Sequence, residues 1–178
     1  MYRVKKFDDK DKKIIKCIHD ELEKITIPKV YCSKGLGPHH AEKTGVTRQR
    51  NARQCVFGVV THNAKTFKTK FAKRYPHILK LFKEFMRSHD PTFKFRTVQV
   101  NLNCVCKRHR DSNAKGNNKG DSIIIALGKF TFGRTIIYLD GKPKKFNIKC
   151  KSLKFDGSKI VHASEKFKGK RYSLVFFR

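Results

Sequence analysis

Three consecutive residues of this chain, His109-Arg110-Asp111, have types and spacing that suggest chemistry. The same letters open the catalytic loop of protein kinases, in which an asparagine five residues after the aspartate binds a metal ion. Here that position holds Gly116. The chain also lacks the glycine-rich phosphate loop, and too few residues precede His109 to build an ATP-binding lobe. The sequence therefore argues against a kinase.

A metal site is the alternative. Non-haem oxygenases bind Fe(II) on one side with two histidines and one carboxylate, and leave the other positions open. His109 and Asp111 would point the same way in extended chain, because side chains alternate along a strand. His162, in the segment KIVHAS, is the only histidine after Asp111. These three residues are therefore the predicted iron ligands and catalytic centre.

A cosubstrate site can also be read from the sequence. The distal carboxylate of 2-oxoglutarate needs a cationic partner, and a guanidinium binds a carboxylate through two parallel hydrogen bonds. Arg171 and Ser173 are two residues apart in RYSLVFF. Both side chains can therefore point to the same side of a strand, into one pocket, and supply a cation and a hydroxyl there.

Helical and strand patterns occupy different parts of the chain. Apolar residues at helical spacing predict helices over 7–25 and 75–90, and the basic, glycine-containing segment 31–54 is predicted to be a loop. Strands are predicted over 55–62, 93–105, 122–128, 134–140, 144–150, 152–157, 159–164 and 171–177. Short strands at this spacing are typical of a sandwich or barrel.

The predicted organisation is a single domain over 1–178, mainly β with N-terminal helices (α+β). Residues 1–90 form its helical and basic part, and 91–178 form the β core with the iron site. On the strand predicted over 93–105, Asn101 and Asn103 share a face. Asparagine is uncommon in strands, so we expect polar contacts there, either with a ligand or with backbone groups beside a bulge.

The charge of the chain is its most unusual bulk property. Its 178 residues include 43 Lys and Arg against 14 Asp and Glu, which gives a net charge of +29. Such a field attracts polyanions and favours DNA or RNA as a partner through a basic surface. The segment 43–83 has no acidic residue and is the predicted place of that surface. An AT-rich genome is the competing explanation, because lysine greatly outnumbers arginine.

The six cysteines include no Cys-x-x-Cys pair, and the sequence shows neither a signal peptide nor a long apolar run. We therefore expect reduced thiols and an intracellular protein, in the cytoplasm or nucleus of the host cell if it is viral, with no membrane association. Zinc binding is only weakly indicated, and a monomer is expected.

The ordered set His-x-Asp, distal His and Arg-x-Ser resembles the Fe(II)/2-oxoglutarate-dependent dioxygenase superfamily. The resemblance covers 94–178 well, 45–60 loosely and the first 40 residues hardly at all. It is strongest to short oxygenases of large DNA viruses and protists, with the AlkB and TET oxygenases as more distant relatives. It implies a double-stranded β-helix, or jelly roll, with iron inside one open end.

The resemblance also assigns roles. His109, Asp111 and His162 match the iron triad, Arg171 matches the cosubstrate arginine, and Ser173 matches its hydroxyl partner. AlkB-like members bind 2-oxoglutarate with an asparagine and a tyrosine two apart on the preceding strand. Asn101 and Asn103 occupy those positions here, so Asn103 replaces the tyrosine.

A second departure lies in the segment LGKFTFG, 127–133. The viral group has Leu-Gly-Asp-(Phe/Tyr)-Thr-Gly-Gly there, so Lys129 and Phe132 depart from the pattern without touching a predicted ligand. The loop 112–121 is expected at the mouth of the site, where it could gate substrate. Phe130 or Phe132 could stack on a base, although packing in the core or at the rim is the simpler role.

The predicted function is an oxygenase that uses Fe(II), 2-oxoglutarate and O2, with ascorbate as an accessory reductant, to hydroxylate a C–H bond. A modified nucleobase of DNA or RNA is the preferred substrate. Two alternatives stay open. One is a hydroxylase of protein side chains such as proline or lysine, and the other is a non-catalytic jelly roll that binds nucleic acid.

Overall fold

The computed structural model describes residues 1–29, 51–62, 65–111 and 120–178. Within them the helices are α1 (Asp9–Lys24), α3 (Lys70–Arg74) and α4 (Pro76–His89). The strands are β1 (Tyr2–Lys6), β2 (Arg53–His62), β3 (Lys65–Lys68), β4 (Thr97–Leu102), β5 (Ser122–Leu127), β6 (Phe130–Phe132), β7 (Thr135–Leu139), β8 (Lys142–Phe146), β9 (Lys151–Phe155), β10 (His162–Ser164), β11 (Phe167–Gly169) and β12 (Tyr172–Phe177). Among these helices, none is long and apolar enough to cross a membrane.

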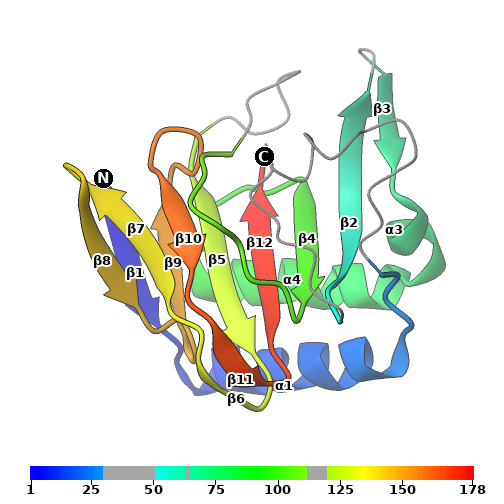
Figure 1. The fold of residues 1–178 in the computed structure, drawn as a ribbon. Helices are drawn as coiled ribbons and strands as arrows, with labels where there is room; N and C mark the ends of the chain where they lie inside the picture. The colour runs from blue at the N-terminus through cyan, green and yellow to red at the C-terminus, as the bar shows by residue number, and fades with distance from the viewer. Residues whose placement is uncertain (30–50, 63–64, 112–119) are drawn as a thin grey trace.

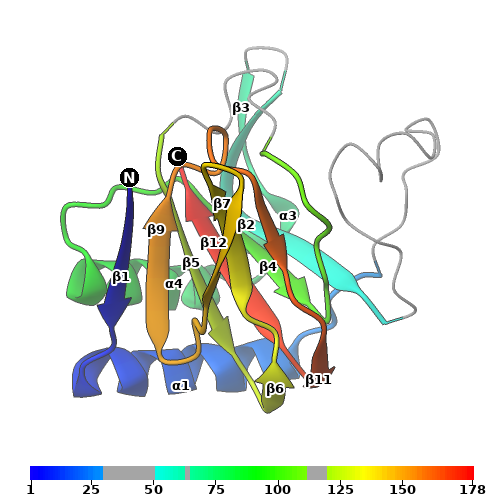
Figure 2. The ribbon, with the colours of Figure 1, turned by 60° about the vertical axis from the view of Figure 1, so that its left-hand side comes forward.

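The strands form one large antiparallel sheet and smaller sheets that face it (Figures 1 and 2). The large sheet has seven strands in the order β1-β9-β5-β12-β4-β2-β3, and the smaller sheets have the orders β10-β7-β8 and β11-β6. Most neighbours in the large sheet are far apart in sequence, as where β12 lies between β4 and β5. The fold is a double-stranded β-helix, as expected.

Helices α1 and α4 cover the outer face of the large sheet (Figure 1). α1 begins where the side chain of Asp8 accepts a hydrogen bond from the Asp11 N–H, and α4 has Pro76 in its first turn. Each helix buries one apolar stripe against the sheet. This core includes Ile14, Ile18, Leu22, Ile78, Phe82 and Phe85 from the helices, and Val98, Val100, Leu174 and Phe176 from the strands.

A second apolar cluster lies between the facing sheets. Its buried members are Ala126, Phe130, Ile137, Ile148, Leu153 and Phe155. Side chains therefore alternate along β12: Tyr172, Leu174 and Phe176 join the helix-side core. Ser173, and Arg171 just before the strand, then belong to the face toward the smaller sheets. The alternation brings polar residues into the interior of the jelly roll.

The helices and most strands lie where the sequence predicts them. The N-terminal part contributes more than helices, because β1 pairs with β9 and β2 pairs with β4 in the large sheet. The short elements β3, α3, β6 and β11 were not predicted. The strand predicted over 93–105 ends at Leu102, because Asn103 has a φ of 55° and cannot continue it. Most of the loop predicted over 31–54 lies outside the described residues.

A buried polar network joins α1, α4 and β9 behind the large sheet. The His89 ring lies 2.6 Å through Nδ1 from Asp11 Oδ2 and 2.7 Å through Nε2 from Ser152 Oγ. The order Ser-His-Asp is that of a hydrolase triad. All three residues are buried, however, and the His89 ring packs against Phe7 and Phe85. The network therefore holds the layers together and offers no access to a substrate.

Replacing His89 tests this structural role. His89→Leu leaves the Asp11 carboxyl and the Ser152 hydroxyl buried without their partner, and we expect a loss of at least about 2 kcal/mol in the free energy of unfolding. Urea denaturation followed by circular dichroism measures it. His77→Leu, on the exposed face of the same helix, is the matched control and should change stability little. Equal stability of the two variants would contradict a structural role for the network.

Candidate active site

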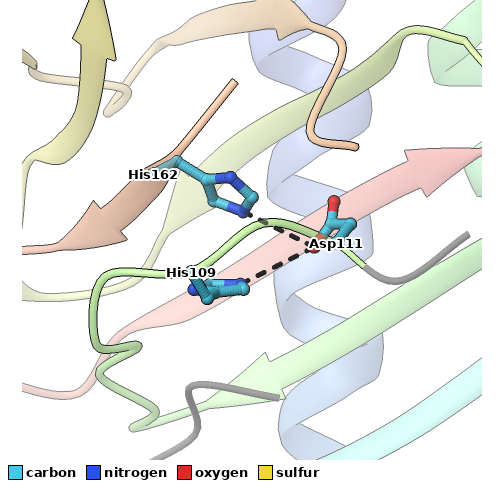
Figure 3. A group of neighbouring side chains, drawn as sticks. All are labelled: His109, Asp111 and His162. Atoms are coloured by element: carbon cyan, nitrogen blue, oxygen red, sulfur yellow. Dashed lines mark ion pairs between the residues drawn. The ribbon is translucent and has the colours of Figure 1, made fainter. Parts of the chain in front are cut away.

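Three side chains from two distant segments converge inside one end of the jelly roll. His109 Nε2 lies 3.6 Å and His162 Nε2 lies 3.5 Å from Asp111 Oδ1. One potential ligand atom from each residue lies within 4.8 Å of the others, and both rings point at the carboxylate (Figure 3). Ligands about 2.1 Å from a common metal ion lie about 3 Å from one another in octahedral geometry. A small contraction would therefore let the three hold a cation on one face.

Backbone hydrogen bonds bring these segments together. The His109 N–H donates to the His162 carbonyl at 2.9 Å, and the His162 N–H donates to the His109 carbonyl at 2.8 Å. This antiparallel bridge makes the segment before Asp111 a neighbour of β10, which itself pairs with β7. The Asp111 N–H donates to the Gly157 carbonyl at 2.9 Å. Each predicted ligand is thus fixed through its own main chain.

The rings of both histidines are oriented by main-chain carbonyls. His109 Nδ1 lies 2.7 Å from the Lys107 carbonyl oxygen, and His162 Nδ1 lies 3.0 Å from that of Ile160. A carbonyl can only accept, so Nδ1 of each ring carries a proton, while Nε2 faces the carboxylate. This second contact is the usual way in which proteins orient histidine ligands.

Electrostatics keep the central carboxylate charged. Burial alone would raise the pKa of Asp111, but hydrogen bonds and charge from His109 and His162 outweigh it and hold that pKa well below its ordinary value. Burial would lower the pKa of His109, yet the contacts with Asp111 and the Lys107 carbonyl raise it. The site is therefore anionic at its centre, as a cation requires.

Gly157 makes room for this carboxylate. A Cβ at that position would lie 2.2 Å from Asp111 Oδ2 and 3.3 Å from His162 Cε1. No real side chain tolerates the first distance, so only glycine permits the observed arrangement. Sequence patterns do not reveal this residue, because its role depends on a contact across 46 residues of chain (157 minus 111). The only local sign is a glycine in the turn FDGSK before His162.

Arg171 is a buried cation that forms no ion pair with any described residue. Its side chain is 2% exposed, and neither Nε nor Nη2 has a hydrogen-bond partner within the described part of the chain. Burial lowers its pKa to about 10, so the guanidinium is still charged at neutral pH. Its central carbon lies 5.5 Å from the ring centre of Phe130 and 5.7 Å from that of Phe167. Unpaired donors on a buried charge are costly, so the pocket suits a carboxylate ligand.

Gly133 lies beside the Arg171 side chain, in the segment that departs from the family pattern. A Cβ on Gly133 would lie 3.1 Å from both Cδ and Nε of Arg171, so the retained glycine leaves space for the guanidinium. Phe132 is 65% exposed and has a φ of 63°. Lys129 is also exposed. Neither departure contacts the three predicted iron ligands.

Asn101 and Ser173 lie beside Arg171 in a buried polar row. They are cross-strand neighbours, and the Asn101 amide donates to Ser173 Oγ at 3.3 Å. Gln54 and Gln99 each donate to Asn101 Oδ1 at 2.8 Å. The row therefore carries hydroxyl and amide groups along the same interior face as the guanidinium.

Asn103 takes the backbone role that the sequence left open. Its side-chain oxygen accepts from the Arg171 N–H at 3.0 Å, and its own N–H donates to the Arg171 carbonyl at 2.8 Å. Asn103 thus positions Arg171 through its main chain. Of the loop predicted at the mouth, 112–119 lies outside the described residues.

The fold corresponds to one class of solved structures. No protein-family model and no curated protein matches the chain. Solved structures do: the chain has the fold of the 2-oxoglutarate- and Fe(II)-dependent oxygenases. An oxidoreductase of that family from Burkholderia pseudomallei has a TM-score of 0.65 and 15% identity, covering 99% of this chain and 84% of its own.

More distant members of the same class also align. A Pseudomonas putida prolyl-4-hydroxylase has a TM-score of 0.57 and 11% identity, over 99% of this chain and 91% of its own. NgTET1 in complex with 5mC DNA has a TM-score of 0.54 and 13% identity, over 91% of this chain and 67% of its own. At these identities the likeness concerns the fold.

Gly157→Ala tests the geometry around Asp111. The added methyl displaces the carboxylate, so we expect Mn(II) affinity to fall at least about 10-fold by isothermal titration calorimetry, as for other losses of ligand orientation. Gly141→Ala is the control, since a Cβ there meets nothing within 4 Å although φ is +75°. It should lose stability through backbone strain and keep its metal affinity. Unchanged Mn(II) binding by Gly157→Ala would refute the arrangement.

Proposed function

We propose that the protein is an Fe(II)- and 2-oxoglutarate-dependent dioxygenase. The observation that carries this proposal is a pair of complementary clusters in one interior. One is formed by His109, Asp111 and His162 around the Asp111 carboxylate, and the other is the buried Arg171, with two donors that no described residue pairs. We assign the three cluster residues as iron ligands. Arg171, with Ser173 and Asn101, is assigned to the distal carboxylate of 2-oxoglutarate.

When bound, iron and 2-oxoglutarate supply the oxidising chemistry: one O2 is consumed, 2-oxoglutarate becomes succinate and CO2, and a substrate C–H becomes C–OH. The chain's own residues would bind and orient the metal ion and the 2-oxo acid. Three ligands on one face leave the remaining positions for cosubstrate and O2. The Arg171 fork fixes the far end of the 2-oxo acid, and the apolar cluster around Phe130 and Phe167 excludes water from it. Ascorbate is proposed only as an accessory reductant.

For the substrate we favour a modified nucleobase. The net charge of +29 supports a polyanionic partner, and the solved NgTET1 relative is in complex with 5mC DNA. A hydroxylase of protein side chains is the second candidate. Its support is the prolyl hydroxylase from Trichoplax adhaerens, solved with a peptide fragment of a hypoxia inducible factor, which aligns at a TM-score of 0.57 and 10% identity over 99% of this chain and 83% of its own.

Succinate release separates these candidates. The Fe(II)-loaded protein is incubated with 2-oxoglutarate, ascorbate and, in turn, methylated single-stranded DNA, methylated RNA and proline- or lysine-containing peptides. We expect methylated nucleic acid to stimulate succinate formation above the rate without substrate. Stimulation by peptide alone would favour the protein hydroxylase. Absence of any metal binding would favour a non-catalytic jelly roll.

His162→Ala tests the metal assignment. Two remaining ligands cannot hold iron facially, so we expect tight one-to-one binding of Mn(II) or Co(II) to be abolished while the circular dichroism spectrum stays unchanged. His62→Ala, which removes a histidine at the end of β2, should bind as the parent does. Parental affinity in His162→Ala would show that the triad is wrongly assigned.

Arg171→Met tests the cosubstrate assignment while keeping most of the buried volume. Losing a charge-assisted pair of hydrogen bonds in a dry site costs about 1.5 to 3 kcal/mol, or roughly 10- to 150-fold in affinity. We expect 2-oxoglutarate to bind the Mn(II)-loaded variant more weakly by this factor, with Mn(II) affinity nearly unchanged. If 2-oxoglutarate binds equally well, its carboxylate partner lies elsewhere.

A further inference from the structure

A basic groove lies where the N-terminal strand β1 meets the smaller sheet β10-β7-β8, beside the segment that carries His109 and Asp111. Its volume is about 620 Å³, and its lining includes Tyr2, Arg108, Arg110, Tyr138 and Lys159. Segments distant in sequence meet there: the N-terminal strand, the segment before Asp111, the β7–β8 turn and the approach to β10. Nothing in the proposed reaction uses these side chains.

Strand alternation explains why the groove and the iron site share their main chain. His109 and Asp111 face inward toward His162, so the intervening Arg110 and the preceding Arg108 face outward. Tyr138 follows the same rule. Ile137, its neighbour on β7, is fully buried between the sheets, while Tyr138 lines the groove. The sequence Arg-His-Arg-Asp thus places two guanidinium groups on one side and two predicted ligands on the other.

The groove carries positive charge that the described residues neutralise only in part. Neither Arg108 nor Arg110 forms an ion pair with any described residue, although both are exposed. Lys159 lies 3.7 Å from Asp156, and among the described residues of the lining Asp140 alone is acidic. Arginine is the scarcer cation of this lysine-rich chain, so lysine-rich composition alone does not account for two of them here.

Aromatic rings accompany these cations. The guanidinium of Arg108 lies over the Tyr138 ring at 4.2 Å from its centre. The ammonium group of Lys144 lies 4.9 Å from the centre of the Tyr2 ring and donates to its hydroxyl. Cations interleaved with aromatic rings along a groove bind single-stranded nucleic acid, because phosphates pair with the cations and unstacked bases pack on the rings. An acidic peptide would pair with the cations of the groove but would not account for its aromatic rings.

We propose that this groove binds the sugar-phosphate backbone of single-stranded nucleic acid, as a site separate from the iron centre. Single-stranded DNA and single-stranded RNA share the features that the groove would bind, a phosphodiester backbone and accessible bases. The inference does not require that the protein be an oxygenase, since the groove can hold a strand whether or not a base reaches iron. It places the polyanion contact beside the ligand-bearing segment.

Fluorescence anisotropy with the full chain tests the proposal. The probes are labelled 12-nucleotide single strands of one mixed sequence, as DNA and as RNA, in about 100 mM NaCl. The groove variant Arg108→Gln/Arg110→Gln/Lys159→Gln removes three positive charges, and we expect affinity for at least one strand type to fall at least about 10-fold. The slope of log affinity against log salt should become shallower by about 2, which corresponds to roughly 0.7 for each phosphate that the variant no longer binds.

The matched control is Lys10→Gln/Lys13→Gln/Lys16→Gln, which removes three exposed charges on α1, outside both the groove and the basic segment 43–83. It has the same net charge as the groove variant, and we expect less than about a 2-fold loss. Arg108→Lys/Arg110→Lys should recover part of the affinity, because it restores charge without the planar fork. Mn(II) titration of every variant shows that the iron site is intact.

Equal losses in the groove and control variants would overturn the proposal, because binding would then follow net charge alone. Tighter binding of an acidic peptide than of either strand, abolished in the groove variant, would also overturn it and assign the groove to a protein partner. These results are independent of succinate release. Failure of the oxygenase reaction with intact strand binding would refute the proposed function and leave the groove assignment standing.

Discussion

The pair of hydrogen bonds between the main chains of His109 and His162 is the contact on which the site depends. The two residues are 53 positions apart (162 minus 109), and neither lies in a long strand. Because each donates to the other's carbonyl, the bridge sets the distance between the two rings and fixes their inward direction. Carbonyls of Lys107 and Ile160 then fix the rotation of each ring. The jelly roll supplies this pairing by closing the smaller sheet over the larger one.

The second constraint is the buried charge of Arg171. A guanidinium sealed between Phe130 and Phe167 loses its hydration, and two of its nitrogens gain nothing in return from the described residues. Such an arrangement costs stability and is expected where a ligand completes it. Asn103 and Gly133 support this arrangement by holding the Arg171 main chain and leaving space beside its side chain. The cluster around the Asp111 carboxylate and the cationic Arg171 thus carry opposite charges within one interior.

The sequence predicted the residues whose chemistry is distinctive and missed those whose role is spatial. His109, Asp111 and His162 could be predicted to converge, because a facial iron site needs those types and only one later histidine was available. Arg171 and Ser173 followed from strand alternation. Gly157 could not be found, since its importance lies in a contact with Asp111 that no local pattern records. Asn103 looked like a ligand or a backbone partner, and only its φ of 55° and its hydrogen bonds distinguish the two roles.

The elements of the fold also divide into those that the sequence predicts and those that it does not. Helices α1 and α4 were predicted because their apolar stripes are local in sequence, whereas β1 was not, since its five residues are mostly polar and exposed and its place depends on pairing with β9. The short strands β6 and β11 exist only through each other. Their pairing still matters, because it sets Phe130 and Phe167 around the guanidinium. Local patterns therefore predict the helices, whereas strands that are placed by pairing with distant residues can be found only in the structure.

A crystal structure of the protein grown anaerobically with Mn(II) and 2-oxoglutarate tests the central claim most directly. Anomalous scattering should place one metal ion against His109 Nε2, Asp111 Oδ1 and His162 Nε2. The distal carboxylate of the 2-oxo acid should lie about 2.7 to 2.9 Å from Nε and Nη2 of Arg171. A metal ion bound by other residues, or a carboxylate that leaves the Arg171 guanidinium unpaired, would contradict the account.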